Sequence, residues 1–395
     1  MTKKHTLFYY FLAIVHLIAL RVDAEQPYPL TCFCSPLPPP SCSPGYNPTA
    51  YLKCGGSDCN PCAAISGRVD FLWWRAAEEG TSLGCEESFR SFTTRVQPSV
   101  RTRLYNDSRI KNLNSHYKPG FRLGLDYVCV CDGWDAAINW THFHTSANAE
   151  GFSKFNDGKM IFLLPSWERV KCLLPQKAKA TWKLELDLVD LEVGRKFYLS
   201  SCFIARPLIG IRAARIAQSY RTKSYANDIG RGAGLSDVYF SKTDSSGCFL
   251  ALGPRIGALL EYRMGCGIAF FGEAATSILF GRFDRHANEQ CALYPSGTSF
   301  GADYDYHSST GCDRQSRTVT DMSVGVNFSR CVEWCNRVRR ITLSFAWEHH
   351  VFYHLNSFNF ATNSVELPDQ QTQCSRGKSG NLYTQGLVVS ADVGF

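Results

Sequence analysis

Residues 250–262 read LALGPRIGALLEY, and this stretch indicates the fold class. Most of its large apolar side chains share one parity, namely Leu250, Leu252, Ile256 and Leu260. The other parity holds Arg255, Leu259 and Glu261. A period of two places these two sets on opposite faces of an extended strand. The stretch is also long enough to cross a membrane as a tilted strand, which takes about 9–11 residues.

The same alternation recurs along most of the chain. We trace it in the segments 69–76, 92–101, 119–127, 134–143, 181–197, 203–213, 250–262, 268–280, 319–328, 341–352 and 382–395. Single-chain bacterial barrels have even strand counts, so we predict at least one further strand, in 77–91 or 159–164, and roughly 12–16 strands in total. After Leu188 the apolar parity changes to that of Leu191 and Val193, which predicts a β-bulge.

Two folds share this period, a soluble β-sandwich and a membrane β-barrel. Aromatic residues gather near the segment ends, as in an interfacial girdle. Short links near 128–133, 199–202, 263–267 and 329–340 alternate with long polar links near 144–180, 214–248, 281–318 and 353–381. Short periplasmic turns and long outer loops are typical of bacterial barrels. We therefore predict an all-β, antiparallel, transmembrane outer-membrane β-barrel over residues 67–395.

Both ends of the chain support export to an outer membrane. Lys3 and Lys4 precede the apolar run Leu7–Leu20, and we interpret residues 1–24 as a signal peptide because the run is too short for a membrane helix. The closing strand alternates up to the terminal Phe395, which resembles the signal read by the barrel-assembly machinery. We expect that machinery and outer-membrane lipid as partners.

Cysteine is unusually abundant, with 18 residues in the chain. In an exported protein these thiols are expected to form disulfides. Residues 25–66 are rich in cysteine and proline, and we predict a disulfide-rich N-terminal segment there, ahead of the barrel. The predicted disulfide participants lie in that segment or near the short links: Cys32, Cys34, Cys42, Cys54, Cys59, Cys62, Cys129, Cys131, Cys202, Cys266, Cys331 and Cys335.

Several motifs resemble one family. They are Asp70–Trp74, Pro119–Gly124, Asp132–Asp135 and Leu191–Phe197, and with the closing strand they resemble the Legionella-type major outer membrane protein family. The resemblance implies a pore-forming outer-membrane barrel. The cysteine content is more similar to the chlamydia-related branch, in which disulfides cross-link the envelope, and this implies self-association through disulfide-linked neighbours.

Charged residues on the less apolar parity are predicted to line the pore, because charges facing lipid would cost roughly 2–4 kcal/mol each at the midplane. They are Arg122, Asp126, Lys183, Glu185, Asp187, Arg206, Arg212, Arg255, Glu261, Glu273 and Glu348. We predict a porin-like channel for passive diffusion of ions and small polar solutes. The alternative is a structural envelope protein or an adhesin with a narrow or plugged lumen.

Other chemistries find little support in the sequence. Gly297–Gly301 fits the G-x-S-x-G pattern but lacks the strand and helix that the motif needs. The pairs His142/His144 and Cys59/Cys62 are explained more simply by a strand end and by a disulfide. We expect no enzyme activity, no cofactor and no metal. The net charge of +7 is spread along the chain without a basic block, so no nucleic-acid partner is expected.

Overall fold

We analysed a computed structural model of the chain. It describes residues 63–96, 99–129, 134–156, 159–165, 176–200, 202–227, 238–294, 303–334, 337–356, 364–367, 370–373 and 380–394. All of them belong to the compact unit Asn47–Phe395. The predicted signal peptide, nearly all of the cysteine-rich segment, Gly297–Gly301 and Phe395 lie outside the described residues. Among the residues described, no helix is long and apolar enough to span a membrane.

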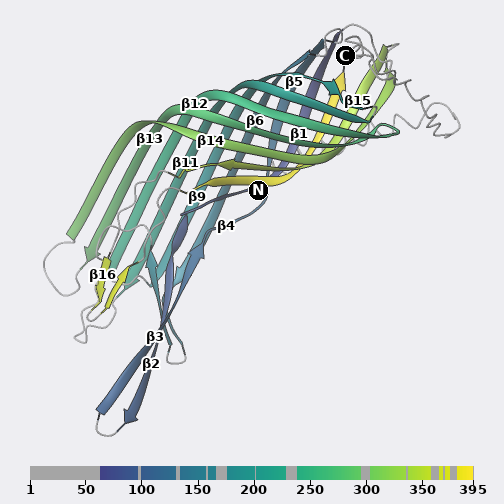
Figure 1. The fold of residues 1–395 in the computed structure, drawn as a ribbon. Helices are drawn as coiled ribbons and strands as arrows, with labels where there is room; N and C mark the ends of the chain where they lie inside the picture. Colours follow the sequence, from purple (N-terminus) through teal and green to yellow (C-terminus); the bar gives the residue numbers. More distant parts are fainter. Residues whose placement is uncertain are drawn as a thin grey trace. The chain divides into compact units, whose positions relative to one another are not determined.

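Ten antiparallel strands form one closed sheet (Figure 1). They are β1 (Ala63–Glu78), β5 (Lys118–Cys129), β6 (Trp134–Phe152), β9 (Lys177–Arg195), β11 (Phe203–Asn227), β12 (Val238–Gly265), β13 (Ile268–Tyr294), β14 (Asp303–Trp334), β15 (Arg337–Phe352) and β18 (Leu382–Gly394). The first strand closes on the last, with Val69 opposite Ala391. On the other side, β9 pairs with both β6 and β11. The all-β barrel predicted from the sequence is therefore confirmed.

The sheet has twelve strands, the lower limit of the predicted 12–16, but only ten of them build the ring. The sheet also contains β4 (Asn114–Ser115) and β10 (Phe197–Tyr198), but these two-residue elements pair with the same neighbours as β5 and β9 and continue those strands. Segment 92–101, which the sequence predicts to be a barrel strand, is not part of the ring. It belongs to β2 (Ser82–Val96) and β3 (Ser99–Asn112), in a separate sheet.

That second sheet has the strand order β3-β2-β8-β7, with β7 at Lys154–Asn156 and β8 at Lys159–Pro165. Both places where a further barrel strand was expected, 77–91 and 159–164, therefore contribute to it. A hairpin of β16 (Ser364–Leu367) and β17 (Gln370–Gln373) forms a third sheet. The barrel follows from the ten remaining segments alone.

The two ends of the barrel differ in the length of their connections. At one end the turns are short, as between Gly265 and Ile268, where Gly265 and Gly267 adopt positive φ. At the other end β12, β13 and β14, which are 28, 27 and 32 residues long in total, continue as paired strands far into the links 214–248 and 281–318 that were expected to be loops. Short turns mark the periplasmic end of bacterial barrels. On this rule we expect the long strands to extend toward the cell exterior.

Large apolar side chains cover the outward face next to the short turns. Examples are Leu125 on β5, Ile209 on β11 and Ile256 on β12, which are 59%, 62% and 60% exposed. Aromatic residues such as Trp73, Trp140 and Trp347 lie on the same face. An exposed apolar belt of this extent is unfavourable in water and is the surface that lipid covers. We refer to it as the lipid belt.

Candidate functional site in the barrel lumen

The lumen at the level of the lipid belt is polar and holds a cavity of about 310 Å³. Ionisable side chains from all ten strands of the ring line it. Eight of the eleven predicted pore-lining residues are among them: Arg122, Asp126, Arg206, Arg212, Arg255, Glu261, Glu273 and Glu348. Their place on the lumen wall follows from their parity, and their part in conduction stays a prediction.

The other three predicted pore-lining residues, Lys183, Glu185 and Asp187, face outward, and this part of the prediction is wrong. Strand β9 alternates without interruption, and its pairing with β6 shows no register shift. The predicted bulge after Leu188 is therefore absent from this strand. Leu184, Leu186 and Leu188 point into the lumen and are buried, instead of facing lipid.

The change of apolar parity at Leu188 has a different cause. Within the lipid belt the outward side meets lipid and the inward side is polar. Above the belt the outward side meets water, and the lumen must be filled by packed side chains. The apolar residues therefore move from the outward to the inward face while the strand itself stays regular. Strand β11 shows the same reversal between Ile211, which faces out, and Ile216, which faces in.

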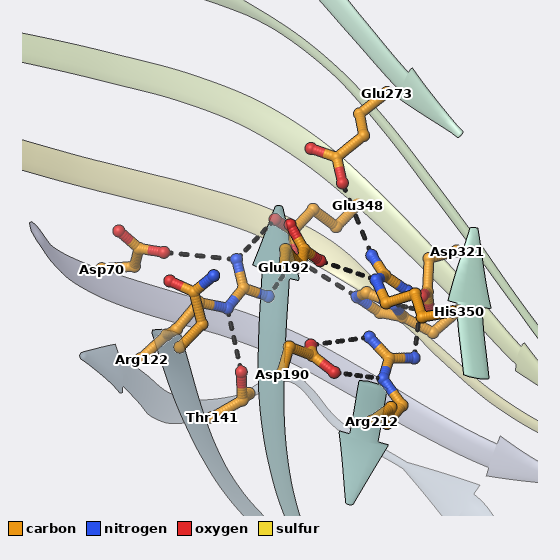
Figure 2. A network of polar contacts seen from close by, with 12 residues as sticks. Asp70, Arg122, Thr141, Asp190, Glu192, Arg212, Glu273, Asp321, Glu348 and His350 are labelled. Atoms are coloured by element: carbon orange, nitrogen blue, oxygen red, sulfur yellow. Dashed lines mark hydrogen bonds and ion pairs between the residues drawn. The ribbon is translucent and has the colours of Figure 1, made fainter. Parts of the chain in front are cut away.

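The centre of the lumen contains a connected layer of ion pairs, which we call the ionic layer (Figure 2). On one side Arg122 of β5 donates two hydrogen bonds of 2.9 Å to the Glu348 carboxylate of β15. The same guanidinium donates to Asp70 of β1 at 3.2 Å and to the Thr141 hydroxyl of β6 at 2.9 Å. Four strands are thereby tied together through one arginine.

On the other side Asp321 of β14 is shared by two arginines. Arg212 of β11 donates to Asp321 at 2.7 Å and to both oxygens of Asp190 at 2.6 and 2.8 Å. Arg255 of β12 also donates to Asp321, and it donates to Glu192 at 2.7 Å. Asp190 and Glu192 belong to β9. This half of the ionic layer therefore joins four further strands, β9, β11, β12 and β14.

His350 of β15 connects the two halves. Its Nδ1 atom is 2.7 Å from Asp321, and its Nε2 atom is 3.2 Å from Glu348. An unbroken series of polar contacts therefore crosses the lumen from Asp70 to Asp190. All of these side chains are largely buried, and Arg212 is 2% exposed.

A second group of polar contacts lies nearer the periplasmic end. Arg206 of β11 donates from Nε to both oxygens of Asp135 on β6 at 2.8 Å. Arg68 of β1 donates to Asn139 at 2.5 Å, and its Nε lies 3.7 Å from Asp70. These residues line the same cavity below the ionic layer.

An apolar layer closes the lumen on the outer side of the ionic layer. Its buried members include Leu72 and Trp74 of β1, Phe143 of β6, Trp182 of β9 and Phe249 of β12. They belong to one continuous buried cluster that also contains Leu83 and Leu355. In this state of the barrel, a hydrated ion that enters the cavity meets first the ionic layer and then packed side chains.

Several residues of the ionic layer were not among the predicted pore-lining residues. They are Asp70, Asp190, Asp321 and His350, together with Glu192. Each lies on the lumen-facing parity of a segment that we had traced, so the parity that identified Arg212 and Glu348 could also have identified them. Within the described ranges, no group of three or more His, Cys, Asp or Glu side chains could hold a metal ion.

The described cysteines lie at both ends of the barrel. Cys202, Cys266 and Cys331 lie at or beside the short periplasmic turns, and Cys331 is disulfide-bonded. Cys248 and Cys312 are free thiols on the outward face of β12 and β14, above the lipid belt. Each lies directly opposite Asp284 of β13. The other predicted disulfide participants lie outside the described residues or, for Cys129, have no described side chain.

Comparison with known proteins places the chain in a family. Residues 61–393 match the family described as Legionella pneumophila major outer membrane protein precursor, so the chain belongs to this family of the outer membrane. The solved structures that are similar include the outer membrane protease OmpT from Escherichia coli, with 8% identity, a TM-score of 0.32, and 84% and 96% of the two chains covered. A Pseudomonas aeruginosa FadL homologue has 9% identity, a TM-score of 0.21, and coverages of 85% and 90%. No curated protein matches the sequence.

Proposed function

We propose that this member of the Legionella major outer membrane protein family is a porin-like channel for small ions and polar solutes whose resting state is closed. The polar cavity forms its periplasmic vestibule. The ionic layer and the apolar layer beyond it form the closed part. Passage then requires both layers to rearrange, and this favours small solutes and infrequent opening over the wide, open pore of a general porin.

The observation that carries the proposal is the charge of the lumen at the level of the lipid belt. Replacing a buried ion pair by packed apolar residues is often neutral or stabilising, so buried ion pairs contribute little to stability. The outer half of the same lumen is filled by apolar side chains and shows that such filling is feasible here. Retaining the ionic layer is therefore better explained by a path for charged or polar solutes than by stability.

The ionic layer also offers alternative pairings. Arg255 lies 3.5 Å from Glu273 in addition to its bonds with Glu192 and Asp321. Arg212 and Arg255 could exchange Asp321 without leaving any of the three charges unpaired. Such an exchange would open a gap in the layer at a lower free-energy cost than breaking a buried pair outright.

A second candidate function is a structural barrel of the envelope, and the apolar layer favours it. A lumen that is packed with Trp74, Phe143 and Trp182 needs no opening in order to anchor the strands that extend outward. Disulfides would then link the barrel to its neighbours. Non-reducing gels of whole outer membranes, prepared with thiols blocked before lysis, should show high-mass species that collapse to monomer on reduction. A monomer under both conditions would contradict the cross-linking.

Single-channel recording in a planar bilayer separates the two candidates. The refolded full chain should give small, discrete and infrequent current steps. Asp321→Asn removes the carboxylate that Arg212, Arg255 and His350 share, and it should raise the open fraction. Asp244→Asn serves as the control, because Asp244 is an outward-facing carboxylate on β12 outside the lumen. Unboiled gels, on which folded barrels migrate apart from unfolded chain, verify that each variant is folded.

The outcomes are distinct. Steps from the wild type, with more opening in Asp321→Asn and none added by Asp244→Asn, support a channel closed by the ionic layer. A folded wild type and a folded Asp321→Asn that both remain silent at all voltages would reject the channel in favour of the structural barrel.

A further inference from the structure

A row of lysines crosses three neighbouring strands on the outward face of the barrel, above the lipid belt. Lys223 of β11 lies directly opposite Lys179 of β9 on one side and Lys242 of β12 on the other. Like charges directly opposite each other destabilise a sheet. The row therefore costs stability, and its presence calls for another explanation.

The surroundings add two further cations and two carboxylates, so positive charge remains in excess. Lys177 and Arg221 lie two positions away on the same outward faces, and with the row they form what we call the lysine patch. Two carboxylates lie beside it: Glu150 of β6, which is directly opposite Lys179 and 2.5 Å from Lys177, and Asp244, which pairs with Arg221 and lies 2.7 Å from Lys242. Among the residues that the structure describes, Lys179 and Lys223 have no carboxylate within 4.0 Å.

Aromatic rings border the patch on its outer side. Tyr225 and Phe240 pack together with their centroids 5.2 Å apart, and Lys177 lies 5.1 Å from the centroid of Phe152. Tyr225 and Phe152 are 44% and 40% exposed. Such rings provide flat apolar surfaces beside the cations, a combination suited to a charged saccharide.

The direction of the patch indicates what it meets. Its side chains share the outward parity of the lipid belt on the same strands, so they point sideways, parallel to the membrane plane. Counting from Arg215, the first charged outward residue above the belt on β11, Lys223 lies roughly 20 Å further out along a tilted strand. At that height the neighbour is the saccharide of the outer-leaflet glycolipid in which the barrel stands.

We propose that the lysine patch binds the phosphorylated core saccharide of the outer-leaflet glycolipid. Phosphate groups placed along the row would neutralise the opposed ammonium groups of Lys179, Lys223 and Lys242. The aromatic rings beyond them would contact the sugar faces. The site lies outside the lumen and is independent of any conduction through it.

Binding to purified lipopolysaccharide tests the proposal. The refolded full chain is titrated with lipopolysaccharide that carries core phosphates and with the same material after dephosphorylation. The test variant is Lys179→Gln/Lys223→Gln/Lys242→Gln. The control variant, Arg109→Gln/Lys118→Gln/Arg314→Gln, loses the same charge outside the patch. Unboiled gels verify that both variants are folded, and heparin is titrated in parallel as a soluble sulfated polysaccharide.

The wild type should prefer the phosphorylated form, and the test variant should lose on the order of 100-fold in affinity for it, since each lysine near an anionic surface contributes about fivefold. The control variant should lose less than about threefold. Equal binding of phosphorylated lipopolysaccharide by the wild type and the test variant would overturn the proposal. A loss restricted to heparin would overturn it in favour of a soluble polyanion.

Discussion

Two histidine–aspartate pairs of equal length lie on opposite faces of the barrel wall, and they allow the stability of the ionic layer to be measured. His350 Nδ1 is 2.7 Å from Asp321, and His142 Nδ1 is 2.7 Å from Asp187. The side chains of the first pair are 8% and 7% exposed, and those of the second are 38% and 24% exposed. The pairs therefore differ in their environment much more than in their geometry.

We predict that Asp321→Asn lowers the free energy of unfolding by about 3–5 kcal/mol, the range for a buried ion pair that loses one partner. The value should fall toward the lower limit, because Arg212 keeps Asp190 and Arg255 keeps Glu192. Asp187→Asn should cost less than about 1 kcal/mol, because its partners His142 and Arg215 are exposed to solvent.

Urea titration of the refolded chain in lipid vesicles provides the measurement. Tryptophan fluorescence and the mobility of the folded band on unboiled gels should give coincident transitions, as a two-state analysis requires. If the two substitutions differ by less than about 1 kcal/mol, water or mobile counter-charges screen the ionic layer, and its description as a buried network is wrong.

Three further predictions concern conduction, assembly and orientation. Changing Arg122, Arg206, Arg212 or Arg255 individually to Glu adds negative charge to the cavity wall and should shift reversal potentials toward cation preference. Unchanged reversal potentials in all four variants would mean that these arginines lie off the conducting path. Deleting Phe395 should lower the amount of protein in the outer membrane while export continues, and normal surface levels would argue against an assembly signal at this residue. A membrane-impermeant maleimide applied to intact cells should label Cys248 and Cys312 but leave disulfide-bonded Cys331 unlabelled. Absence of label at both Cys248 and Cys312 would mean that the long strands point toward the periplasm.

The sequence alone located all ten strands of the ring, because every barrel strand carries an alternation that its environment enforces. Within the lipid belt, one face of a strand such as 250–262 must be apolar and the other must tolerate a polar lumen. Segment 92–101 alternates in the same way but forms the tip of the β2–β3 hairpin outside the ring, where Val96 lies opposite Ser99. An alternation of apolar and polar residues with period two indicates a strand with two different faces. It does not show which sheet that strand joins.

The lumen wall was harder to predict, because parity alone does not say where the membrane ends. Lys183, Glu185 and Asp187 were assigned to the lumen on the assumption that the apolar face meets lipid along the whole strand. That assumption holds for Val189, Leu191 and Val193, which are exposed on the outward face, and fails from Leu188 toward the outer end. The ion-pair partners were a separate difficulty, since Arg122 and Glu348 are 226 positions apart in the chain.

The reversal of polarity along each strand also accounts for where the two candidate sites lie. Below the reversal the lumen is the polar side, so charges gather inside, and the ionic layer forms there. Above it the outer wall is the polar side, and the lysine patch forms on the outward parity of β9, β11 and β12. On β11 this outward parity carries Ile211 in lipid and Lys223 in the saccharide zone, and the inward parity carries Arg212 in the lumen and Ile216 in the apolar layer. A charge on these strands can therefore be assigned to lumen or surface once its parity and its side of the reversal are both known.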